Sequence, residues 1–570
     1  MRLTFIFLLL FSLQSAFGQQ NDTIKAGSWA DSVYNSLNED ERIGQLIVTR
    51  LSSIDMKTMK ITFLNKQVMD YVKKYNVGSI CIFQGSPTLQ AGMINELKKA
   101  AKTPILFSID GEWGLGQRIL DSVMPLPKQM MLGAVKDSQL IYQYGKVVAA
   151  QCKRMGIQMN YAPVMDVNNN PNNPIINDRS FGENKYKVAS YGMEYIKGLQ
   201  DNGVMACAKH FPGHGDVDVD SHLDLPVIKK SMEQIDALEL YPFKMAFKQN
   251  VSSVMIAHLF IPTIDSTKNK PTSLSSNAIQ DLLRSKLKYN GLTITDGLEM
   301  QGVKKAYPNG EASVRSLMAG NDLLCLPDSL PMVVEKIKSA IQQNLLTWGD
   351  IEWHCKRVLM AKYKYVLPYN DTINQQQLTA DLNKDVPAIR KSIATNAITL
   401  LSNKDQDFFP LHLHKNKHKL VYVSIGMDTA NELAKQLIAE YNADVYYFPL
   451  GKKNADSIKM KLDSIVATGK KVIIGIHQIQ RAPINNFSMS KEVVNFVTAL
   501  QRQTNSITFL FGNAYAAKNW CDARNFVVCY EDDAIVQTVA LEMLKGKLPY
   551  SGTLPVSVCE KYPFGYGICK

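Results

Sequence analysis

Short apolar runs alternate with longer amphipathic stretches from about residue 40 to residue 365 of the chain. The apolar runs are rich in β-branched residues and include GSICIF (78–83), PILFSID (104–110), MNYAPVMDV (159–167), GVMACAKH (203–210), SSVMIAH (252–258), LTITD (292–296) and NDLLCL (321–326). Helical stretches fall between them, among which are residues 136–154, 185–202, 231–249 and 309–319. Strand–helix alternation of this kind predicts an α/β domain with a parallel sheet covered on both faces.

The placement of polar residues decides between a closed and an open sheet. Several predicted strands end in polar residues, namely Asp110, Asp166, Lys209, His210, His258 and Asp296. The carboxyl ends of the strands meet at one mouth in a (β/α)8 barrel, whereas an open doubly wound sheet would spread them out. We therefore predict a (β/α)8 TIM-like barrel as the domain of residues 19–370.

A polar stretch rich in Asn and Gln follows the predicted barrel at residues 367–385. The alternation then resumes with AITLLS (397–402), KLVYVSIG (419–426), DVYYFPL (444–450), KVIIGIH (471–477), ITFLFGN (507–513) and NFVVCYE (525–531). We predict a linker at residues 371–390 and a second α/β sandwich domain at residues 391–570.

The first residues, MRLTFIFLLLFSLQSAFGQQ, have the composition of a secretory signal peptide. One positive charge at Arg2 precedes an apolar run that ends near Leu13, and Ala16-Phe17-Gly18 supplies a small-x-small cleavage pattern. No later apolar stretch approaches the roughly 20 residues needed to cross a bilayer. Residues 1–18 are therefore expected to be removed from a protein exported to the periplasm or the extracellular space.

Composition narrows the classes of function only slightly. The chain is 46% hydrophobic and 20% charged, which is ordinary for a soluble globular protein. Its formal charge of +12 comes from scattered lysines without a nucleic-acid fingerprint, so the charge favours plain solubility or an anionic polymer such as cell wall. Nine cysteines leave at least one thiol unpaired, and the cluster near the C-terminus could form a disulfide from Cys521, Cys529, Cys559 and Cys569.

The segment KHFPGHGDVDVDSHLDLP, residues 209–226, concentrates histidines and aspartates. His210 and His214 have the spacing of two metal ligands on one helix face, but Pro212 and Gly213 lie between them and suit no helix interior. The intervening glutamate of zinc hydrolases is also missing. We therefore predict that the segment holds no catalytic metal.

Two further interpretations apply to the second half of this segment. Alternate aspartates imitate a calcium-binding loop, but Ser221 and Val227 replace the glycine and the glutamate that such a loop requires. Asp220 and His222 are two residues apart, so their side chains leave the same face of an extended segment. An aspartate that holds one imidazole nitrogen leaves the other free to exchange a proton. The alternative is that both are ordinary polar residues of a surface loop.

The segment at residues 209–226 resembles the signature of the β-N-acetylglucosaminidases of glycoside hydrolase family 3. Similarity to that family extends to NEDERIGQLI (38–47), SIDGEWGLGQR (108–118), NYAPVMDVNNNPNNPIINDRSFG (160–182), TITDGLEM (293–300), AGNDLLCLP (319–327) and GKLPYSGTLPVSV (546–558). It thus covers nearly all of the mature chain. The Asp-Ser-His loop at residues 220–222 separates subfamilies, because family 3 β-glucosidases lack it.

The resemblance implies a cofactor-free, retaining exo-β-N-acetylglucosaminidase that acts on cell-wall or chitin-derived fragments. It implies Asp296 as the nucleophile and His222 as the general acid/base, oriented by Asp220. It assigns the sugar's hydroxyls and N-acetyl group to four residues: Asp110, Arg179, Lys209 and His210. Each of these four could instead form a barrel-mouth salt bridge that positions Asp296.

Several expectations stay open at this point. The rivals are a family 3 β-glucosidase, a glycoside phosphorylase, and a catalytically silent saccharide-binding protein. Trp113 stands where the family more often has glycine, so it lines the sugar pocket or narrows it. His214 and His258 are expected to be structural histidines with satisfied hydrogen bonds, and Asp216 and Asp218 to solvate their loop.

Overall fold

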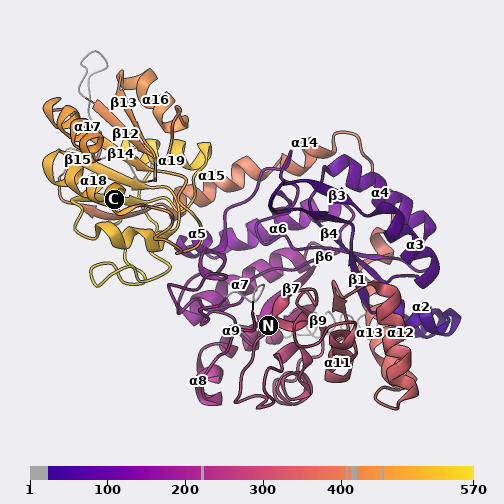
Figure 1. The fold of residues 1–570 in the computed structure, drawn as a ribbon. Helices are drawn as coiled ribbons and strands as arrows, with labels where there is room; N and C mark the ends of the chain where they lie inside the picture. Colours follow the sequence, from indigo (N-terminus) through magenta and orange to yellow (C-terminus); the bar gives the residue numbers. More distant parts are fainter. Residues whose placement is uncertain (1–23, 220–223, 406–407, 412–419, 452–454) are drawn as a thin grey trace, which may run out of the picture.

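The computed structural model describes residues 24–219, 224–405, 408–411, 420–451 and 455–570. The ribbon forms a barrel followed by a second, smaller sheet with its own helices (Figure 1). The predicted signal peptide and the predicted dyad of Asp220 and His222 lie outside the described residues.

Eight parallel strands form the first sheet. They are β1 (Ile47–Arg50), β4 (Ser79–Ile82), β5 (Leu106–Ile109), β6 (Met159–Asn160), β7 (Met205–Phe211), β8 (Ser253–Ile256), β9 (Leu292–Thr295) and β10 (Leu324–Cys325). The strand order is β10-β1-β4-β5-β6-β7-β8-β9, and a parallel bridge between Ile294 and Leu323 joins its two ends. The predicted barrel is confirmed.

Strand β1 is absent from the predicted set. Its four residues, IVTR, follow the short helix α2 (Glu39–Gly44) closely, and just the first two are apolar and buried. Pairing with β10 on one side and β4 on the other makes it a strand. A run of four residues is too short to show a hydrophobic period. Its conformation depends instead on pairing with strands that are distant in sequence.

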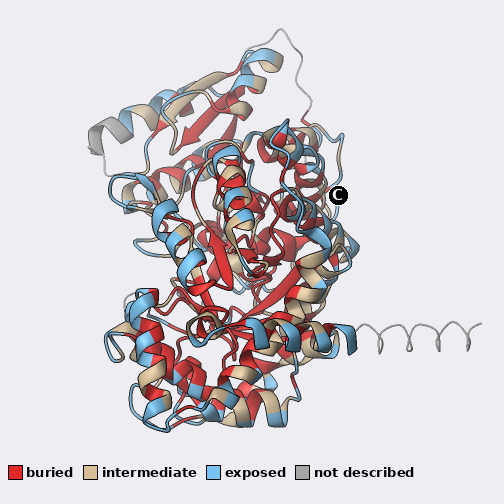
Figure 2. Ribbon diagram, turned by 90° about the vertical axis from the view of Figure 1, so that its right-hand side faces the viewer, coloured by how far each residue is buried: buried red, intermediate tan, exposed pale blue. Residues whose placement is uncertain are grey.

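Helices surround the barrel, and buried residues follow the strands and the inward faces of these helices (Figure 2). The longer ones are α3 (Asn65–Tyr75), α4 (Pro87–Ala100), α6 (Gln139–Arg154), α7 (Lys185–Gln200), α9 (Leu240–Lys248), η4 (Asn277–Lys286), α11 (Glu311–Ala319), α12 (Leu330–Gln342) and α13 (Trp348–Tyr365). Side chains of Ser86, Asn184 and Thr347 cap α4, α7 and α13 by accepting bonds from free backbone N–H groups.

The helix predicted at residues 231–249 is two helices, α8 (Met232–Ala237) and α9. Pro242 lies in the first turn of α9. In a continuous helix its ring would clash with the carbonyl of Leu238, which is where the chain breaks. Pro242 could therefore have predicted, from the sequence, that the helix is interrupted near Leu238.

The second sheet contains six strands. They are β11 (Thr399–Asn403), β12 (Leu420–Ile425), β13 (Asp444–Phe448), β14 (Lys471–Ile476), β15 (Ser506–Leu510) and β16 (Asn525–Val528). The order is β11-β16-β15-β14-β12-β13, and all neighbours are parallel except β11 and β16. With the helices α16 (Glu432–Tyr441), α17 (Ala455–Ala467), α18 (Lys491–Gln503) and α19 (Ala534–Leu544), the sheet forms the predicted second α/β unit.

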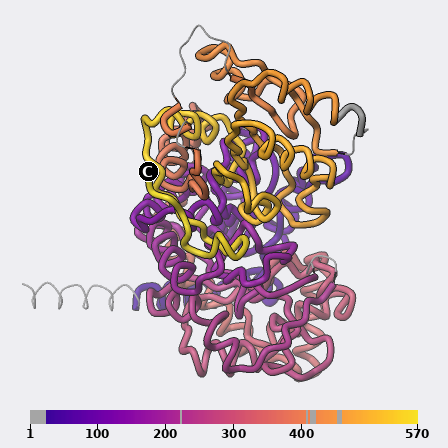
Figure 3. The backbone as a smooth tube through the Cα atoms, turned by 90° about the vertical axis from the view of Figure 1, so that its left-hand side faces the viewer, coloured from indigo at the N-terminus to yellow at the C-terminus, as the bar shows by residue number. Residues whose placement is uncertain are grey.

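The chain crosses between the two sheets more than once. Residues 371–390, the predicted linker, hold α14 (Leu378–Asn383) and the start of α15 (Val386–Ala397), which runs on to β11 (Figure 1). The last segment, yellow in Figure 3, returns to the barrel, where Thr553 N donates to Ala134 O at 3.0 Å. The boundary is therefore bridged by helices and by the C-terminal segment.

Cys521 and Cys559 form a disulfide, which is one of the pairings that the sequence left open near the C-terminus. The other seven cysteines are free, and six of them are buried. Disulfides form in oxidising compartments, where the predicted signal peptide would bring the protein. Export itself stays a prediction.

None of the helices in the described ranges combines the length and the apolar composition that crossing a membrane requires.

Lys362 in α13 is completely buried. Its ammonium Nζ donates to Gln45 Oε1 at 2.6 Å, and no carboxylate among the described residues forms an ion pair with it. Burial lowers the pKa of Lys362 from its ordinary 10.5 to about 7. Lys362 therefore lowers the free energy of unfolding at every pH at which its amine is protonated in the unfolded chain, because protonation is less favourable in the folded protein.

We expect Lys362→Met to raise the free energy of unfolding, and to do so most at low pH. Because the folded pKa is the lower one, the wild-type penalty is complete below about pH 7 and fades as the pH rises towards 10.5. The fall of the pKa from 10.5 to about 7 corresponds to at most about 5 kcal/mol. Urea denaturation at pH 6 and pH 10 measures the difference, with Lys364→Met, an exposed lysine of the same helix, as the control. An equal gain at both pH values would contradict the prediction.

Candidate active site

A cavity of about 610 Å³ opens at the mouth of the barrel. Its lining includes all five predicted site residues that the structure describes, namely Asp110, Arg179, Lys209, His210 and Asp296. They come from loops after β5, β6 and β9 and from β7 itself. Asp110, Lys209, His210 and Asp296, which were predicted to end strands, thus lie at one mouth, and Arg179 joins them from a loop. Asp220 and His222 lie outside the described residues.

Lys209 is the centre of a buried ion-pair cluster. Its Nζ lies 2.5 Å from Asp110 Oδ1 and 2.7 Å from Glu112 Oε1, with 2% of the side chain exposed. Arg179 binds the same Glu112 through Nη2 at 2.5 Å and Nε at 2.9 Å, in a bidentate pair. Arg118 pairs with the second oxygen of Asp110 and also donates from Nε to its backbone carbonyl at 2.9 Å. Every member is thus held by at least one opposite charge.

The charges of this cluster keep one another ionised. Burial alone would raise the pKa of Glu112, but Arg179 and Lys209 lower it to about 2. Burial likewise opposes the low pKa of Asp110, which Lys209 and Arg118 hold well below its usual range. Burial would lower the pKa of Lys209, yet its two carboxylates raise it. The pocket wall therefore presents fixed, charged hydrogen-bonding groups, which bind polar ligands more strongly than neutral ones.

The ring of His210 is fixed in one tautomer. Its Nδ1 lies 2.7 Å from Asp166 Oδ2, and its Nε2 lies 3.3 Å from Arg179 Nη2. Burial disfavours the Asp166 carboxylate, but His210 and further bonds keep its pKa below the usual range, so Asp166 accepts. The hydrogen-bond network therefore assigns the proton to Nδ1 and leaves Nε2 as an acceptor.

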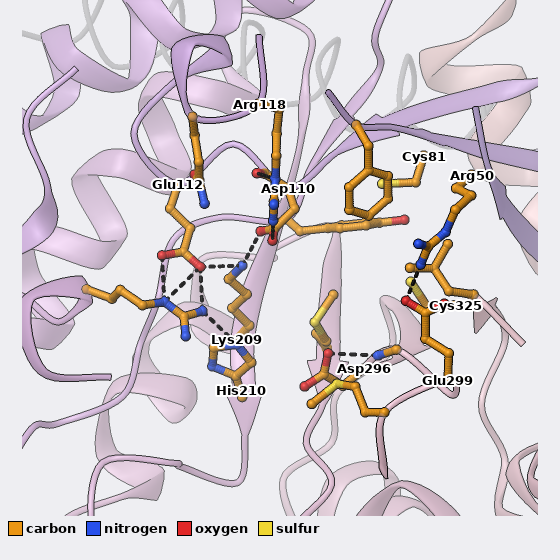
Figure 4. A pocket seen from close by; sticks show the side chains of 18 of the residues that line it. Arg50, Cys81, Asp110, Glu112, Arg118, Lys209, His210, Asp296, Glu299 and Cys325 are labelled. Atoms are coloured by element: carbon orange, nitrogen blue, oxygen red, sulfur yellow. Dashed lines mark hydrogen bonds and ion pairs between the residues drawn. The ribbon is translucent and has the colours of Figure 1, made fainter. Parts of the chain in front are cut away.

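Asp296 follows the last residue of β9 and lies across the pocket from Lys209 and Glu112 (Figure 4). Its backbone N–H donates to Ile256 O at 2.9 Å, which continues the ladder with β8. Its Oδ1 accepts from the N–H of Gly297 at 2.8 Å. A carboxylate held this way at a strand end can attack an electrophilic carbon bound against the opposite wall.

The two remaining histidines of the mouth differ from each other. His258 is buried with Nδ1 at 2.7 Å from Ser273 Oγ and Nε2 at 3.0 Å from Gly297 O, so the expected structural role is confirmed. His214 is also buried, yet neither ring nitrogen has a hydrogen-bond partner among the described residues. The expectation of satisfied bonds was wrong for His214.

Two aspartates of the histidine-rich segment do more than solvate it. Asp216 Oδ2 lies 2.6 Å from Lys230 Nζ, and Lys230 also pairs with the buried Glu239 at 2.5 Å. Asp218 Oδ1 accepts from Asn170 Nδ2 at 2.7 Å. The chain that leads towards residue 220 is thereby anchored to neighbouring loops.

Sequence interpretation missed Glu112 and Arg118, although both belong to the segment quoted for its family resemblance. The available signal was electrostatic, because a buried lysine and a buried arginine at one mouth require more than one carboxylate. Trp113, between them, lines the cavity, and Lys128 Nζ lies 5.9 Å from the centre of its ring. Within the described residues, no three His, Cys, Asp or Glu side chains are grouped as metal ligands.

The second sheet supports one wall of this pocket. Arg481, in the loop after β14, lines the cavity and binds Asp178 Oδ1 through Nη1 at 3.1 Å. Asn513, after β15, donates to Asn177 Oδ1 at 2.6 Å. Asn177 and Asp178 directly precede Arg179 in the short helix η2 (Asn177–Arg179). The loop that carries Arg179 is therefore braced from outside the barrel.

A parallel barrel with charged groups at the carboxyl ends of its strands is the arrangement of barrel enzymes, whose active sites lie at that face. The model of the glycosyl hydrolase family 3 N-terminal domain matches residues 39–361. The chain belongs to glycosyl hydrolase family 3, and the predicted family is confirmed.

Two relatives illustrate the family similarity. The chain is 30% identical over 339 residues to β-hexosaminidase A of Pseudoalteromonas piscicida, an alignment that covers 54% of this chain and 56% of that protein. It is 23% identical over 569 residues to the β-N-acetylglucosaminidase/β-glucosidase of Cellulomonas fimi, covering 93% of this chain and 95% of the relative.

Solved structures agree with the fold. The family 3 β-N-acetylglucosaminidase from Paenibacillus sp. str. FPU-7 has a TM-score of 0.74 at 27% identity, covering 92% of this chain and 99% of that one. A β-glucoside phosphorylase has a TM-score of 0.79 at 21% identity over 94% of this chain and 97% of the other, which is a likeness of fold alone.

Proposed function

We propose that this protein hydrolyses terminal β-linked N-acetylhexosamine from cell-wall or chitin-derived fragments, with retention of configuration. The observation that carries the proposal is the position of Asp296 across the pocket from the cluster of Lys209, Glu112 and Asp110. A nucleophile on one wall and charged hydrogen-bonding groups on the other suit a polyhydroxylated ring bound between them. The similarity to a β-hexosaminidase and to a family 3 β-N-acetylglucosaminidase supports the choice of sugar.

In the proposed first step, a carboxylate oxygen of Asp296 attacks the anomeric carbon and forms the glycosyl-enzyme bond. The bond from that carbon to the leaving oxygen breaks, and His222, oriented by Asp220, donates a proton to the departing oxygen. In the second step His222 takes a proton from water, whose oxygen attacks the anomeric carbon and releases Asp296. Asp110, Arg179, Lys209 and His210 hold the sugar in place throughout.

A β-glucosidase or glycoside phosphorylase is the second candidate. It is favoured by the double name of the Cellulomonas fimi relative. Both candidates use the same nucleophile, so the difference lies in the sugar and in whether water or phosphate accepts it. A catalytically silent saccharide-binding protein would have no use for the anchored carboxylate of Asp296.

A panel of aryl glycosides separates these candidates. We expect 4-nitrophenyl N-acetyl-β-glucosaminide to be hydrolysed with a kcat/KM at least about tenfold above that of the β-glucoside, because binding groups left unpaired by the missing acetamido cost free energy. Addition of phosphate should produce no sugar phosphate. Faster turnover of the glucoside, or a phosphate-dependent product, would favour the second candidate, and no turnover of any glycoside would favour the binding protein.

A further inference from the structure

The backbone around His214 is fixed on every side. Its N–H donates to Asp166 Oδ1 at 2.7 Å, and its carbonyl accepts from Asn173 Nδ2 at 3.0 Å. Gly215 packs so closely that a Cβ there would lie 1.7 Å from Val167 O. Gly213, with φ of +135°, has a conformation that favours glycine. The backbone that carries the His214 ring is therefore held in place by the fold.

His214 differs from the other four histidines that the structure describes. Ring nitrogens of His210, His258, His354 and His477 all lie within hydrogen-bond distance of carboxylates, hydroxyls or carbonyls. The ring of His214 has no such partner among the described residues, although the residue is 1% exposed. A buried polar group without a partner costs folding free energy, so its retention calls for a partner outside the folded chain.

The ring of His214 is part of the wall of the catalytic pocket, together with His210, Asp296 and Met255. The rings of His210 and His214 lie edge to face, with centroids 5.8 Å apart. Because His210 is committed to Asp166 and Arg179, it does not satisfy its neighbour. His214 therefore lines the same cavity as the proposed nucleophile, with its ring next to that of His210.

Burial, reinforced by the neighbouring His210, lowers the pKa of His214 to about 4. The ring is thus neutral near neutral pH and offers one N–H donor and one acceptor lone pair. A sugar hydroxyl is also both a donor and an acceptor. A cation would use the lone pair alone, and an anion the N–H alone, so a hydroxyl is the partner that matches a neutral imidazole.

We infer that His214 is a further substrate-binding residue, whose ring hydrogen-bonds the sugar held between Lys209 and Asp296. This inference rests on the proposed function, in that it requires a saccharide in the pocket. Burying the unpaired ring costs the ligand-free protein folding free energy, and the hydrogen bond to the sugar offsets this cost when the substrate binds.

The test is a double-mutant cycle between His214→Phe and modified substrates. The substrates are 4-nitrophenyl N-acetyl-β-glucosaminide, its 3-deoxy, 4-deoxy and 6-deoxy analogues, and the corresponding glucoside, which lacks the acetamido group. We expect one of these deletions to lower kcat/KM of the wild type on the order of tenfold more than it lowers that of the variant. The melting temperature of ligand-free His214→Phe should equal or exceed that of the wild type, because the unpaired nitrogens are gone.

His354→Phe is the matched control, because His354 is a buried histidine whose Nδ1 lies 3.0 Å from Asp322 Oδ1, outside the pocket. It should lose stability and show no coupling to any substrate group. If His214→Phe does not fold, His214→Asn takes its place in the cycle. Equal losses for every analogue in wild type and variant, with or without a lower melting temperature, would overturn the inference. If the wild type cleaves just glucosides, the proposed function fails, and the cycle is then run on deoxyglucosides.

Discussion

Asp296→Ala should abolish turnover while leaving the fold intact, with kcat lowered by about 10³-fold or more. The substitution removes the attacking oxygen. The other carboxylates that line the pocket, Asp110, Glu112 and Glu299, are each paired with a cation. Steady-state kinetics with an aryl N-acetylglucosaminide measure the loss, and circular dichroism checks the fold. Asp328→Ala, which removes a carboxylate paired with Lys304 outside the cavity, is the control and should retain activity.

Two chemical readouts make the assignment of Asp296 specific. An activated fluoro-sugar should accumulate as a glycosyl-enzyme, and peptide mapping should find the label on Asp296. Azide should restore turnover of Asp296→Ala and give a glycosyl azide of inverted configuration, because a small anion takes the place of the carboxylate. A label on another residue, or nearly full activity of the variant, would refute the role of Asp296.

His222→Ala should lower kcat on substrates with poor leaving groups by about 10²-fold to 10⁴-fold, and much less on substrates with good ones. A good leaving group departs without a proton, so the first step survives and the glycosyl-enzyme persists. Asp220→Ala should show a milder loss of the same kind, because the imidazole remains but is no longer held. A series of aryl N-acetylglucosaminides that spans leaving-group pKa values measures both effects.

The described residues on either side of this segment give the matched control for the dyad. Asp218 contacts Asn170, in the loop that leads to Arg179, and Asp224 lies 3.8 Å from Lys305, in the segment that follows Asp296. Asp224→Ala removes a carboxylate of the same segment and should give no leaving-group dependence. If His222→Ala and Asp220→Ala lose activity equally on all leaving groups, the segment shapes the pocket and another residue transfers the proton.

Most of the fold could be predicted because buried parallel strands leave unbroken apolar runs in the sequence. Seven barrel strands and all six of the second sheet gave such runs, whereas the four residues of β1 did not. Pro242 indicated the break between α8 and α9, but the helical pattern on both sides of the proline led to the prediction of one continuous helix. Short elements and interruptions were therefore the parts that depended on tertiary contacts.

The site was predictable as far as its residues followed strands. Asp110, Lys209 and Asp296 stand at strand ends, and topology brings such positions together. Glu112 was missed because its importance comes from two cations, distant in sequence, that share it. The state of the His214 ring could not be predicted either, because a missing partner leaves no pattern in the sequence.

The support that Arg481 and Asn513 give to the helix η2 ties the catalytic barrel to its neighbour mechanically. The folded and docked second sheet thereby helps to hold the loop from which Arg179 makes its bidentate contact with Glu112. Unfolding of the smaller unit would therefore free the loop that carries Arg179, one of the residues that we propose bind the sugar, without requiring any barrel strand to separate. Heat or proteolysis that unfolds or removes the C-terminal unit would then inactivate the enzyme while its barrel is still folded.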